Sequence, residues 1–269
     1  MARKREDIIL DHIRHVGRAT YSDLARLLDV STMTVRRDIT RMADEGLINK
    51  TLKGAQRISE DELDLLETQL ALRLSEHVTE KRALARQALE MIQNGQTLFL
   101  DGSTTCGELA ALLGHNGSNL TVITNSLLIA QRLRRNRDNT LVLIGGRFDF
   151  DNYTFVGPSA EEQIRQYFVD MAFMSTRGFV PTEGTYESAV DSFRIKQGIV
   201  KQSRRSVLLV DHSKFGLRAL SKVLDVEQLH VVITDDHAPG DQLEYLREKN
   251  ITVVTTSCTD LNMITSDED

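Results

Sequence analysis

From residue 95 onward the chain alternates short apolar runs with helical segments, and this alternation limits its fold more than any other feature. Seven runs are apolar along most of their length, as parallel strands are when both faces are covered. The pattern predicts an α/β domain with a mostly parallel sheet at residues 95–269. The runs are TLFLDG, LTVITNS, TLVLIGG, VDMAFMST, SVLLVD, LHVVITD and ITVVTTS, and helices are expected at 106–113, 127–135, 160–167, 193–204 and 241–249.

The first 57 residues follow the pattern of three short helices and a hairpin. Gly17 ends the first helical stretch. Thr20, with Asp23 three residues later, is suited to cap a second helix, and Ser31 to cap a third that runs to about Asp44. We therefore assign residues 1–57 to a domain of their own.

A different composition joins these two regions. The stretch from 58 to 93 has no Gly or Pro and is rich in Glu, Leu and Ala. It predicts one or two linker helices within 58–94, with an apolar stripe at Leu63, Leu66, Leu70 and Leu74. Two alternatives stay open, because the stripe can pack on its own larger domain or on its copy in a second subunit.

Charge is unevenly distributed along the 269 residues. The net charge is −6, yet residues 1–57 hold 12 Lys and Arg against 8 Asp and Glu, which leaves 21 against 31 for the remainder. A basic end on an acidic body indicates that the end meets a polyanion. We see no signal peptide and no run long enough to span a membrane. Two cysteines and seven histidines without metal-type spacing favour a reducing cytoplasm, no metal and no cofactor.

The stretch VSTMTVRRDIT places two arginines in the third predicted helix. On a helical wheel Val35, Ile39 and Met42 share one side and can pack inward, while Arg37 points outward. A short joint followed by a capped helix with a cationic outer face is typical of a helix-turn-helix, and the hairpin after it would form a wing. Residues predicted to contact double-stranded operator DNA are Ser31, Thr32, Met33, Thr34, Arg36, Arg37, Thr40, Arg41, Lys50 and Lys53.

Polar loops follow several strands of the larger domain. Ligands of open α/β sheets collect beyond the carboxyl ends of strands, and the loop LDGSTTCGE leads directly into a helix whose free N–H groups suit a phosphate. An ordinary capped helix is the alternative. The residues predicted to bind a small anionic effector are Asp101, Gly102, Ser103, Thr104, Thr105, Asn125, Ser126, Gly145, Gly146, Arg147, Lys196, Asp211 and Lys214.

Motifs in both domains resemble those of the DeoR family of bacterial transcriptional regulators. The domain at residues 1–57, called the head below, matches through YSDLARLLDVSTMTVRRDIT. Its wing carries Lys53-Gly54-Ala55 where the family commonly has Gly-Gly-Ala. The larger domain matches in order through Asp101-Gly102-Ser103-Thr104-Thr105, a permuted form of the usual Asp-Ser-Gly-Thr-Thr, then Thr124-Asn125-Ser126, Gly145-Gly146, Val156-Gly157, Asp170-Met171-Ala172-Phe173 and Asp211-His212-Ser213-Lys214-Phe215.

The resemblance implies a winged helix-turn-helix and an effector domain similar to the sugar-phosphate isomerase and CoA-transferase-like fold. It also implies that the protein represses a carbohydrate-catabolism operon and that a phosphorylated sugar or sugar acid releases it from its operator. A homodimer or homotetramer is expected. The rival is a sugar-phosphate isomerase-like enzyme with an accessory DNA-binding head, for which Asp101, Asp170 and Asp211 would supply carboxylates. No nucleophile–base pair is visible, and Cys106 is expected to pack as a small residue, so we assign no catalytic residue.

Overall fold

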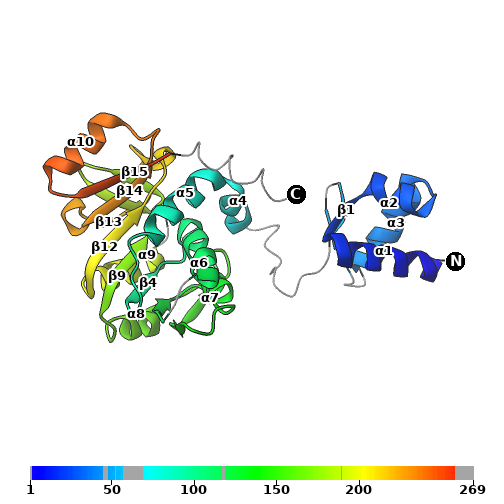
Figure 1. Ribbon diagram of the computed structural model, residues 1–269, viewed down its shortest axis with the longest axis horizontal. Coiled ribbons are helices and arrows are strands. Elements are labelled where there is room, and N and C mark those ends of the chain that lie inside the picture. Colours follow the sequence, from blue (N-terminus) through cyan, green and yellow to red (C-terminus); the bar gives the residue numbers. More distant parts are fainter. Residues whose placement is uncertain are drawn as a thin grey trace. The chain divides into compact units, whose positions relative to one another are not determined.

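The computed structural model describes residues 2–44, 48–51, 53–56, 69–116, 119–188 and 190–257. Its contacts divide the chain into two compact units, Met1–Leu65 and Leu66–Asp269, and Figure 1 labels many of their elements. Within the described ranges, every helix is too short or too polar to cross a lipid bilayer.

The described residues of the smaller unit form three helices and a three-stranded antiparallel sheet in the order β1–β3–β2. β3 lies between its partners, with Ala55 opposite both Ala19 and Lys50. The winged helix-turn-helix is confirmed, with one strand, β1, that the sequence did not predict. The elements are α1 (Ala2–Val16), β1 (Arg18–Thr20), α2 (Tyr21–Leu28), α3 (Thr32–Asp44), β2 (Asn49–Lys50) and β3 (Gly54–Gln56).

Local hydrogen bonds set the helix ends in this unit. The Thr20 hydroxyl accepts from the backbone N–H of Asp23 at the start of α2 (3.2 Å), and the Ser31 hydroxyl accepts from the N–H of Thr34 in α3 (3.2 Å). Gly17, with φ +79°, follows α1. Each N-cap hydroxyl satisfies a helix N–H that has no partner within the helix, so the predicted caps are confirmed.

A seven-stranded, fully parallel sheet forms the centre of the larger unit, in the order β15–β14–β12–β9–β4–β5–β6. The seven predicted runs are these seven strands, which confirms the α/β class. The strands are β4 (Thr97–Leu100), β5 (Thr121–Thr124), β6 (Thr140–Leu143), β9 (Val169–Met174), β12 (Ser203–Leu209), β14 (Val231–Asp235) and β15 (Thr252–Thr256).

Helices cover both faces of this sheet, so most strands are apolar on both sides. On one face, Leu98 and Leu100 pack with Leu84 of α5 and with residues of α6 and α7. On the other face, Phe99 packs with Ile195 of α9 and with residues of α8 and α10. The helices are α4 (Gln69–Ser75), α5 (Val78–Leu89), α6 (Thr104–Asn116), α7 (Leu127–Leu133), α8 (Pro158–Ile164), α9 (Val190–Val200) and α10 (Gly240–Glu248), with 3-10 turns η2 (His212–Lys214) and η3 (Val226–Gln228).

Two parts of the larger unit differ from the expectation. The helix predicted at 193–204 ends at Val200, because the following residues pair with β9 as part of β12, Ser203 opposite Val169. Two small antiparallel sheets were not predicted, because none of their short strands has more than two apolar residues in a row. They are the hairpin β7 (Arg147–Asp149) and β8 (Thr154–Val156), and the sheet β10 (Gly178–Val180), β11 (Gly184–Glu187) and β13 (Ser221–Leu224).

The linker segment contributes α4 and α5 to the larger unit. Leu70 of α4 is fully buried, and α5 packs on the sheet through Leu84 and Ala88. Leu63 and Leu66, the first half of the predicted apolar stripe, lie outside the described residues. The described part of the linker therefore packs on its own body.

Candidate functional site

A pocket of about 300 Å³ opens where the strand order of the large sheet reverses. Strands β4, β5 and β6 proceed outward in one direction, and β9, β12, β14 and β15 proceed in the other. Loops leaving β4 and β9 therefore diverge and leave a crevice at the carboxyl edge of the sheet, which is where ligands bind in open α/β folds.

Most of the predicted effector residues line this pocket. They come from the ends of β4, β5 and β12 and from one face of α9, so they are spread along the chain from Asp101 to Lys214. The predicted residues that line the pocket are Asp101, Gly102, Ser103, Thr104, Thr105, Asn125, Lys196, Asp211 and Lys214.

The other four predicted residues do not line it. Ser126 is buried and caps α7 by accepting from the N–H of Ile129, and Gly145 bonds to the side chain of Gln163. Gly146 passes so close to β8 that an added Cβ would lie 2.7 Å from the carbonyl oxygen of Val156. Arg147 is exposed in β7. The loop after β6 thus starts the β7–β8 hairpin, and the turn of that hairpin lines the pocket in its place, through Asp151, Asn152 and Thr154.

Asp101 organises the loop between β4 and α6. Its Oδ1 accepts from the N–H of Ser103 (3.0 Å) and its Oδ2 from the N–H of Ser175 at the end of β9 (3.1 Å), so one carboxylate joins the two central strand ends. Gly102 approaches the hairpin, where an added Cβ would meet Thr154 Cγ2 at 2.2 Å. Glycine at this position of the permuted motif therefore lets the hairpin close over the loop.

Lys196 is a buried cation held between two carboxylates. Its Nζ lies 3.0 Å from Asp101 Oδ2, is ion-paired with Glu187, and donates to the carbonyl of Ser175 (2.5 Å). Burial by itself would lower the pKa of Lys196, but Glu187 and Asp101 outweigh it and hold the pKa above its ordinary value. Lys196 therefore stays charged, and its ion pairs hold α9 in place at the pocket.

Three cations at the pocket were missed by the sequence analysis, namely Arg73, Lys81 and Arg177. Burial lowers the pKa of Arg73, and the neighbouring Arg177 lowers it further. Burial also lowers the pKa of Lys81, which bonds to backbone carbonyls of Arg73 and Glu76. Among the described residues, no carboxylate lies within ion-pair distance of Arg73, Lys81, Arg177 or Lys214. Several cations without anionic partners make the pocket suited to an anion.

Polar atoms of the pocket also lack partners. Arg73 Nε, Asn125 Oδ1 and Thr154 Oγ1 are buried without a hydrogen bond in the part of the chain that the structure describes. Buried polar groups are nearly always hydrogen-bonded, so two potential donors and an acceptor lining one cavity indicate a polar ligand. Arg73 is oriented there by its Nη2, which donates to Asn152 Oδ1 (2.8 Å).

The carboxylates of the rival enzyme hypothesis are not assembled in one place. Asp101 and Asp211 line the pocket, but Asp170 lies near the amino end of β9, at the opposite edge of the sheet, and accepts from the N–H of Thr97 (3.0 Å). Cys106 is fully buried in the core, and burial raises the pKa of its thiol well above the ordinary value. Its expected packing role is confirmed.

On the smaller unit, α3 presents the predicted DNA-contacting face. Val35, Ile39 and Met42 are fully buried, whereas Met33 is 67% exposed and Arg37 is exposed. Ser31, Thr32 and Arg36 are exposed as well, and Thr34 is half-buried at the amino end of the helix. The predicted inward and outward sides of α3 are therefore found in the structure.

Hydrogen bonds organise the rest of this face. Lys50 Nζ of the wing donates to Thr40 Oγ1 of α3 (2.8 Å), and Lys53 is exposed. Arg41 is ion-paired with Glu6 and lies 3.4 Å from Asp38, so part of its charge is neutralised within the unit. Asp38 is buried between Arg41 and Arg5, so its carboxylate orients these two arginines.

Comparisons with known proteins identify the family of both domains. Residues 5–61 match the model of the DeoR-like helix-turn-helix domain, and residues 76–236 match that of the DeoR C-terminal sensor domain. The HTH-type transcriptional regulator GolR of Listeria innocua is 31% identical over 233 residues, 87% of this chain and 90% of its own. The glycerol-3-phosphate regulon repressor of Escherichia coli is 30% identical over 92% of this chain and 96% of its own.

Solved structures give a weaker likeness. Ribose 5-phosphate isomerase A from Methanocaldococcus jannaschii aligns with 52% of this chain and 55% of its own at 17% identity, with a TM-score of 0.39. A similarity at this level says nothing about a ligand or a reaction.

Proposed function

This chain belongs to the DeoR family of DNA-binding transcriptional regulators, and we propose that it represses a carbohydrate-catabolism operon until a phosphorylated sugar or sugar acid releases it from its operator. The observation that carries the proposal is the pocket at the strand-order reversal, where cations that have no anionic partner among the described residues lie near the amino end of α6. A helix amino terminus and unpaired cations are the groups that recognise a phosphate. The name of the Escherichia coli relative, the glycerol-3-phosphate regulon repressor, points to the same class of ligand.

Release follows if effector and operator favour different states of the protein. Linkage requires that each ligand lowers the affinity of the other by the same factor. The element suited to transmit the signal is α4, because Arg73 lines the pocket and α4 begins at Gln69, close to the boundary between the two units at Leu65.

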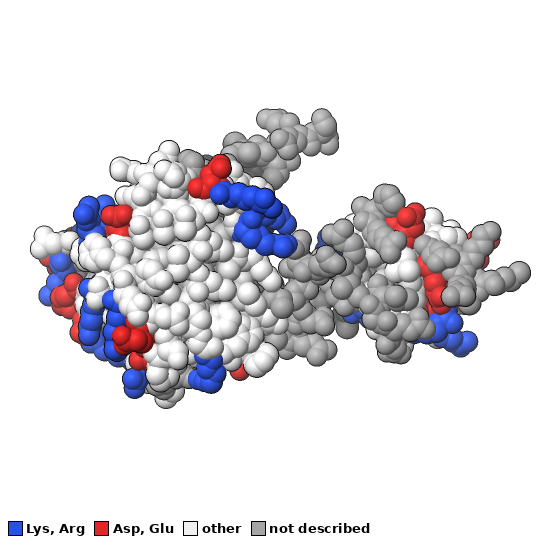
Figure 2. Space-filling model, turned by 90° about the horizontal axis from the view of Figure 1, so that it is seen from below, with Lys and Arg blue, Asp and Glu red and all other residues white. Residues whose placement is uncertain are grey.

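A symmetric oligomer is expected, because two heads reading two half-sites need two copies of the chain. We propose a homodimer or homotetramer. The edge strand β6 exposes Leu141 and Leu143, and Phe150 beyond it is 75% exposed. Figure 2 shows a face of the larger unit on which uncharged residues fill the centre and charged side chains lie mainly toward the rim. Both features favour contact with a second copy, in the cytoplasm where operator DNA is found.

The proposal is tested with the purified full chain. Operator fragments are selected from genomic DNA by binding, and a panel of sugar phosphates and phosphorylated sugar acids is then assayed for release in a gel shift. We expect one compound to release the DNA and to raise the melting temperature without being consumed. Turnover of that compound would favour the isomerase-like enzyme, and failure to select any DNA fragment would reject the regulator.

The first prediction concerns the phosphate-type loop. Changing Thr104 and Thr105 together to valine keeps their shape but removes two hydroxyls at the pocket. We expect the effector concentration needed for release to rise at least about 10-fold, since each lost hydrogen bond to a charged group costs about 1.5–3 kcal/mol. Operator affinity without effector should stay the same. Release at the original concentration would exclude these hydroxyls from the site.

The second prediction separates ligand sensing from DNA binding. We expect Arg73→Ala to bind operator normally but to resist release, because it removes a guanidinium whose buried Nε has no hydrogen-bond partner among the described residues. Arg165→Ala is the matched control, since Arg165 is exposed directly after α8 and, among the described residues, forms an ion pair only with Glu162. The measurement is effector-dependent release in a fluorescence anisotropy assay. Equal responses of the two variants would remove α4 from the proposed signal path.

A further inference from the structure

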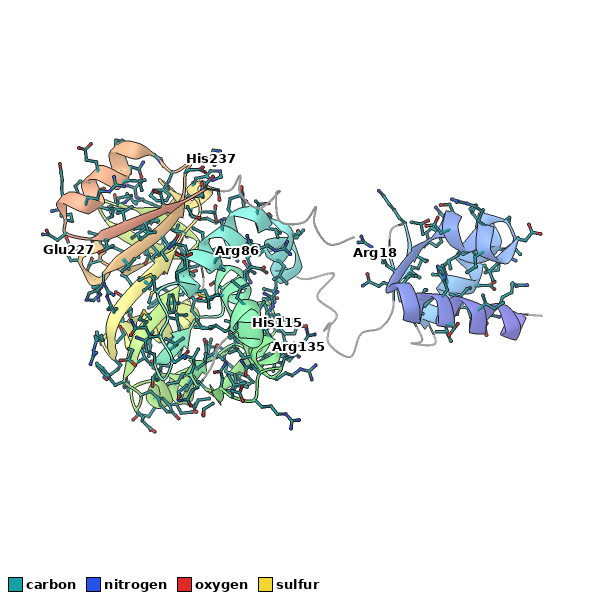
Figure 3. All side chains as sticks on the ribbon, in the orientation of Figure 1. Arg18, Arg86, His115, Arg135, Glu227 and His237 are labelled. Carbon is teal, nitrogen blue, oxygen red and sulfur yellow. The ribbon has the colours of Figure 1, made fainter. Side chains whose placement is uncertain are left out.

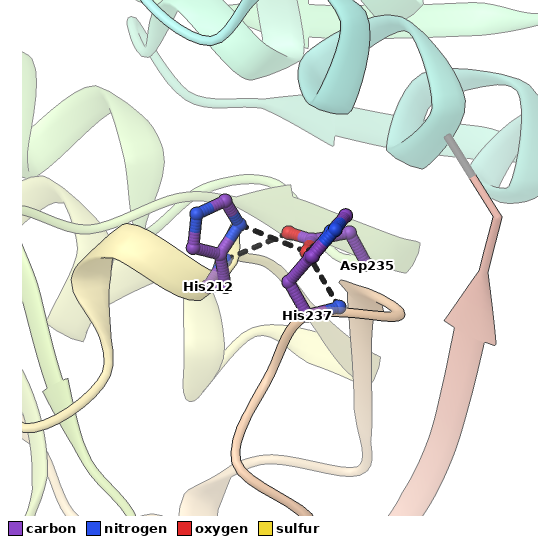
Figure 4. Close-up of side chains that lie close together, drawn as sticks. All are labelled: His212, Asp235 and His237. Carbon is purple, nitrogen blue, oxygen red and sulfur yellow. Dashed lines mark hydrogen bonds and ion pairs between the residues drawn. The ribbon is translucent and has the colours of Figure 1, made fainter. Parts of the chain in front are cut away.

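A second cluster of ligand-type side chains lies beside the effector pocket, and the proposed function does not use it. His212, Asp235 and His237 offer ligand atoms that all lie within 4.8 Å of one another (Figure 4). His212 belongs to η2, Asp235 ends β14, and His237 follows in the next turn. The two histidines are separated along the chain by β13 and β14, so the spacing of histidines in the sequence did not indicate this group.

The carboxylate at the centre of this cluster is a buried anion. The Asp235 side chain has 0% exposure, and in the part of the chain that the structure describes no Lys or Arg nitrogen lies within ion-pair distance of it. Backbone N–H groups hold both oxygens, that of His212 on Oδ2 (2.7 Å) and that of His237 on Oδ1 (3.0 Å). A buried charge needs a compensating charge, and its only ion-pair contacts among described residues are imidazoles.

The separations between these side chains suit a metal ion. His212 Nδ1 lies 2.9 Å and His237 Nδ1 lies 3.4 Å from Asp235 Oδ1. Ligands about 2.1 Å from a zinc ion stand roughly 3.0–3.4 Å apart. His237 is 65% exposed and can turn to complete the set, and Asp236 Oδ1, 3.2 Å from His237 Nδ1, adds negative charge. We propose that His212, Asp235 and His237 bind one divalent transition-metal ion of the zinc type, with the remaining positions open to solvent.

The surroundings of His212 support a built site. The ring of His77 packs edge-on against the ring of His212, with the two centroids 5.6 Å apart. The centroid of the His237 ring lies 5.3 Å from that of His212. The turn η2 also carries Lys214 and directly follows Asp211, and both of these residues line the effector pocket. An ion on His212 would therefore brace the turn that supplies two pocket residues.

The test uses the full chain without an affinity tag, stripped with a chelator and titrated with Zn²⁺ by calorimetry. We expect one saturable Zn²⁺ site per chain and a higher melting temperature with metal. His237→Gln should weaken binding at least about 10-fold, because loss of even an outer partner of a metal ligand costs that much. The double variant His212→Gln and His237→Gln should lose the site.

His115→Gln is the matched control, because His115 is exposed on α6, away from the labelled His237 in Figure 3. Its zinc affinity should equal that of the unchanged chain. Co²⁺ gives a second readout, since a thiolate-to-cobalt charge-transfer band would place the metal on one of the two cysteines and overturn the assignment. Absence of saturable binding, or equal affinity in the unchanged chain and the single His237→Gln variant, would overturn it too. Sugar-phosphate release plays no part in these readouts, so failure here leaves the proposed function standing.

Discussion

Replacing Lys196 by methionine is expected to destabilise the larger unit by about 3–5 kcal/mol, the cost of removing one partner from a buried ion pair. The ammonium group lies between Asp101 and Glu187, and all three side chains are almost fully buried. Methionine fills a similar volume but leaves two buried carboxylates facing each other without a cation. Chemical unfolding followed by circular dichroism measures the loss.

The same ion pairs predict the dependence of stability on alkaline pH. Because the folded-state pKa of Lys196 lies above the ordinary 10.5, its contribution is fully present below pH 10.5 and is lost as the pH rises through the folded value. The unchanged chain should therefore lose this part of its stability only in strongly alkaline buffer, whereas the methionine variant has none to lose. Lys201→Met, at an exposed position just after α9, is the control and should change stability little. A Lys196→Met variant as stable as this control would contradict the assigned role.

Arg37→Ala is expected to weaken operator binding by about 1–3 kcal/mol, or roughly 5- to 150-fold, while the head stays folded. Arg37 is exposed on the outer side of α3, and no core residue depends on it. Arg86→Ala, an exposed arginine on α5 that is labelled in Figure 3, controls for the loss of one positive charge. Gel shifts with the selected operator measure both variants.

The salt dependence tells how Arg37 acts. A phosphate contact would reduce the slope of log affinity against log salt by about 1 and weaken all sequences alike, whereas a base contact would relax specificity at one position. Either result keeps Arg37 in the interface. Operator affinity equal to that of the Arg86→Ala variant would remove it.

The order of elements followed directly from local patterns. Seven apolar runs became the seven parallel strands, because strands covered on both faces must be apolar along their length. The caps at Thr20 and Ser31 were also predictable, since the hydroxyl bonds to an N–H within three residues along the chain. Short strands such as β1 and β7 escaped prediction, because a three-residue strand depends on pairing with a partner that the local pattern does not contain.

The residues of the effector pocket were predictable only where they directly follow a strand in the sequence. The loop at Asp101–Thr105 directly precedes a helix, so its residues could be assigned from adjacent sequence. The same logic placed Gly146 and Arg147 in the site, but the chain turns there into the β7–β8 hairpin. Arg73 and Arg177 gave no such signal, since it is the tertiary structure that places α4 and the β9–β10 loop at the pocket.

The sequence by itself determined that this protein has a cationic three-helix head and a parallel α/β body, because periodicity, capping and charge act over a few neighbouring residues. Only the tertiary structure decided which cations surround the pocket, which carboxylates hold Lys196, and that His212 meets His237 across Asp235. Those contacts join residues that are far apart along the chain. They depend on the order in which the strands pair, and no local pattern of residues encodes that order.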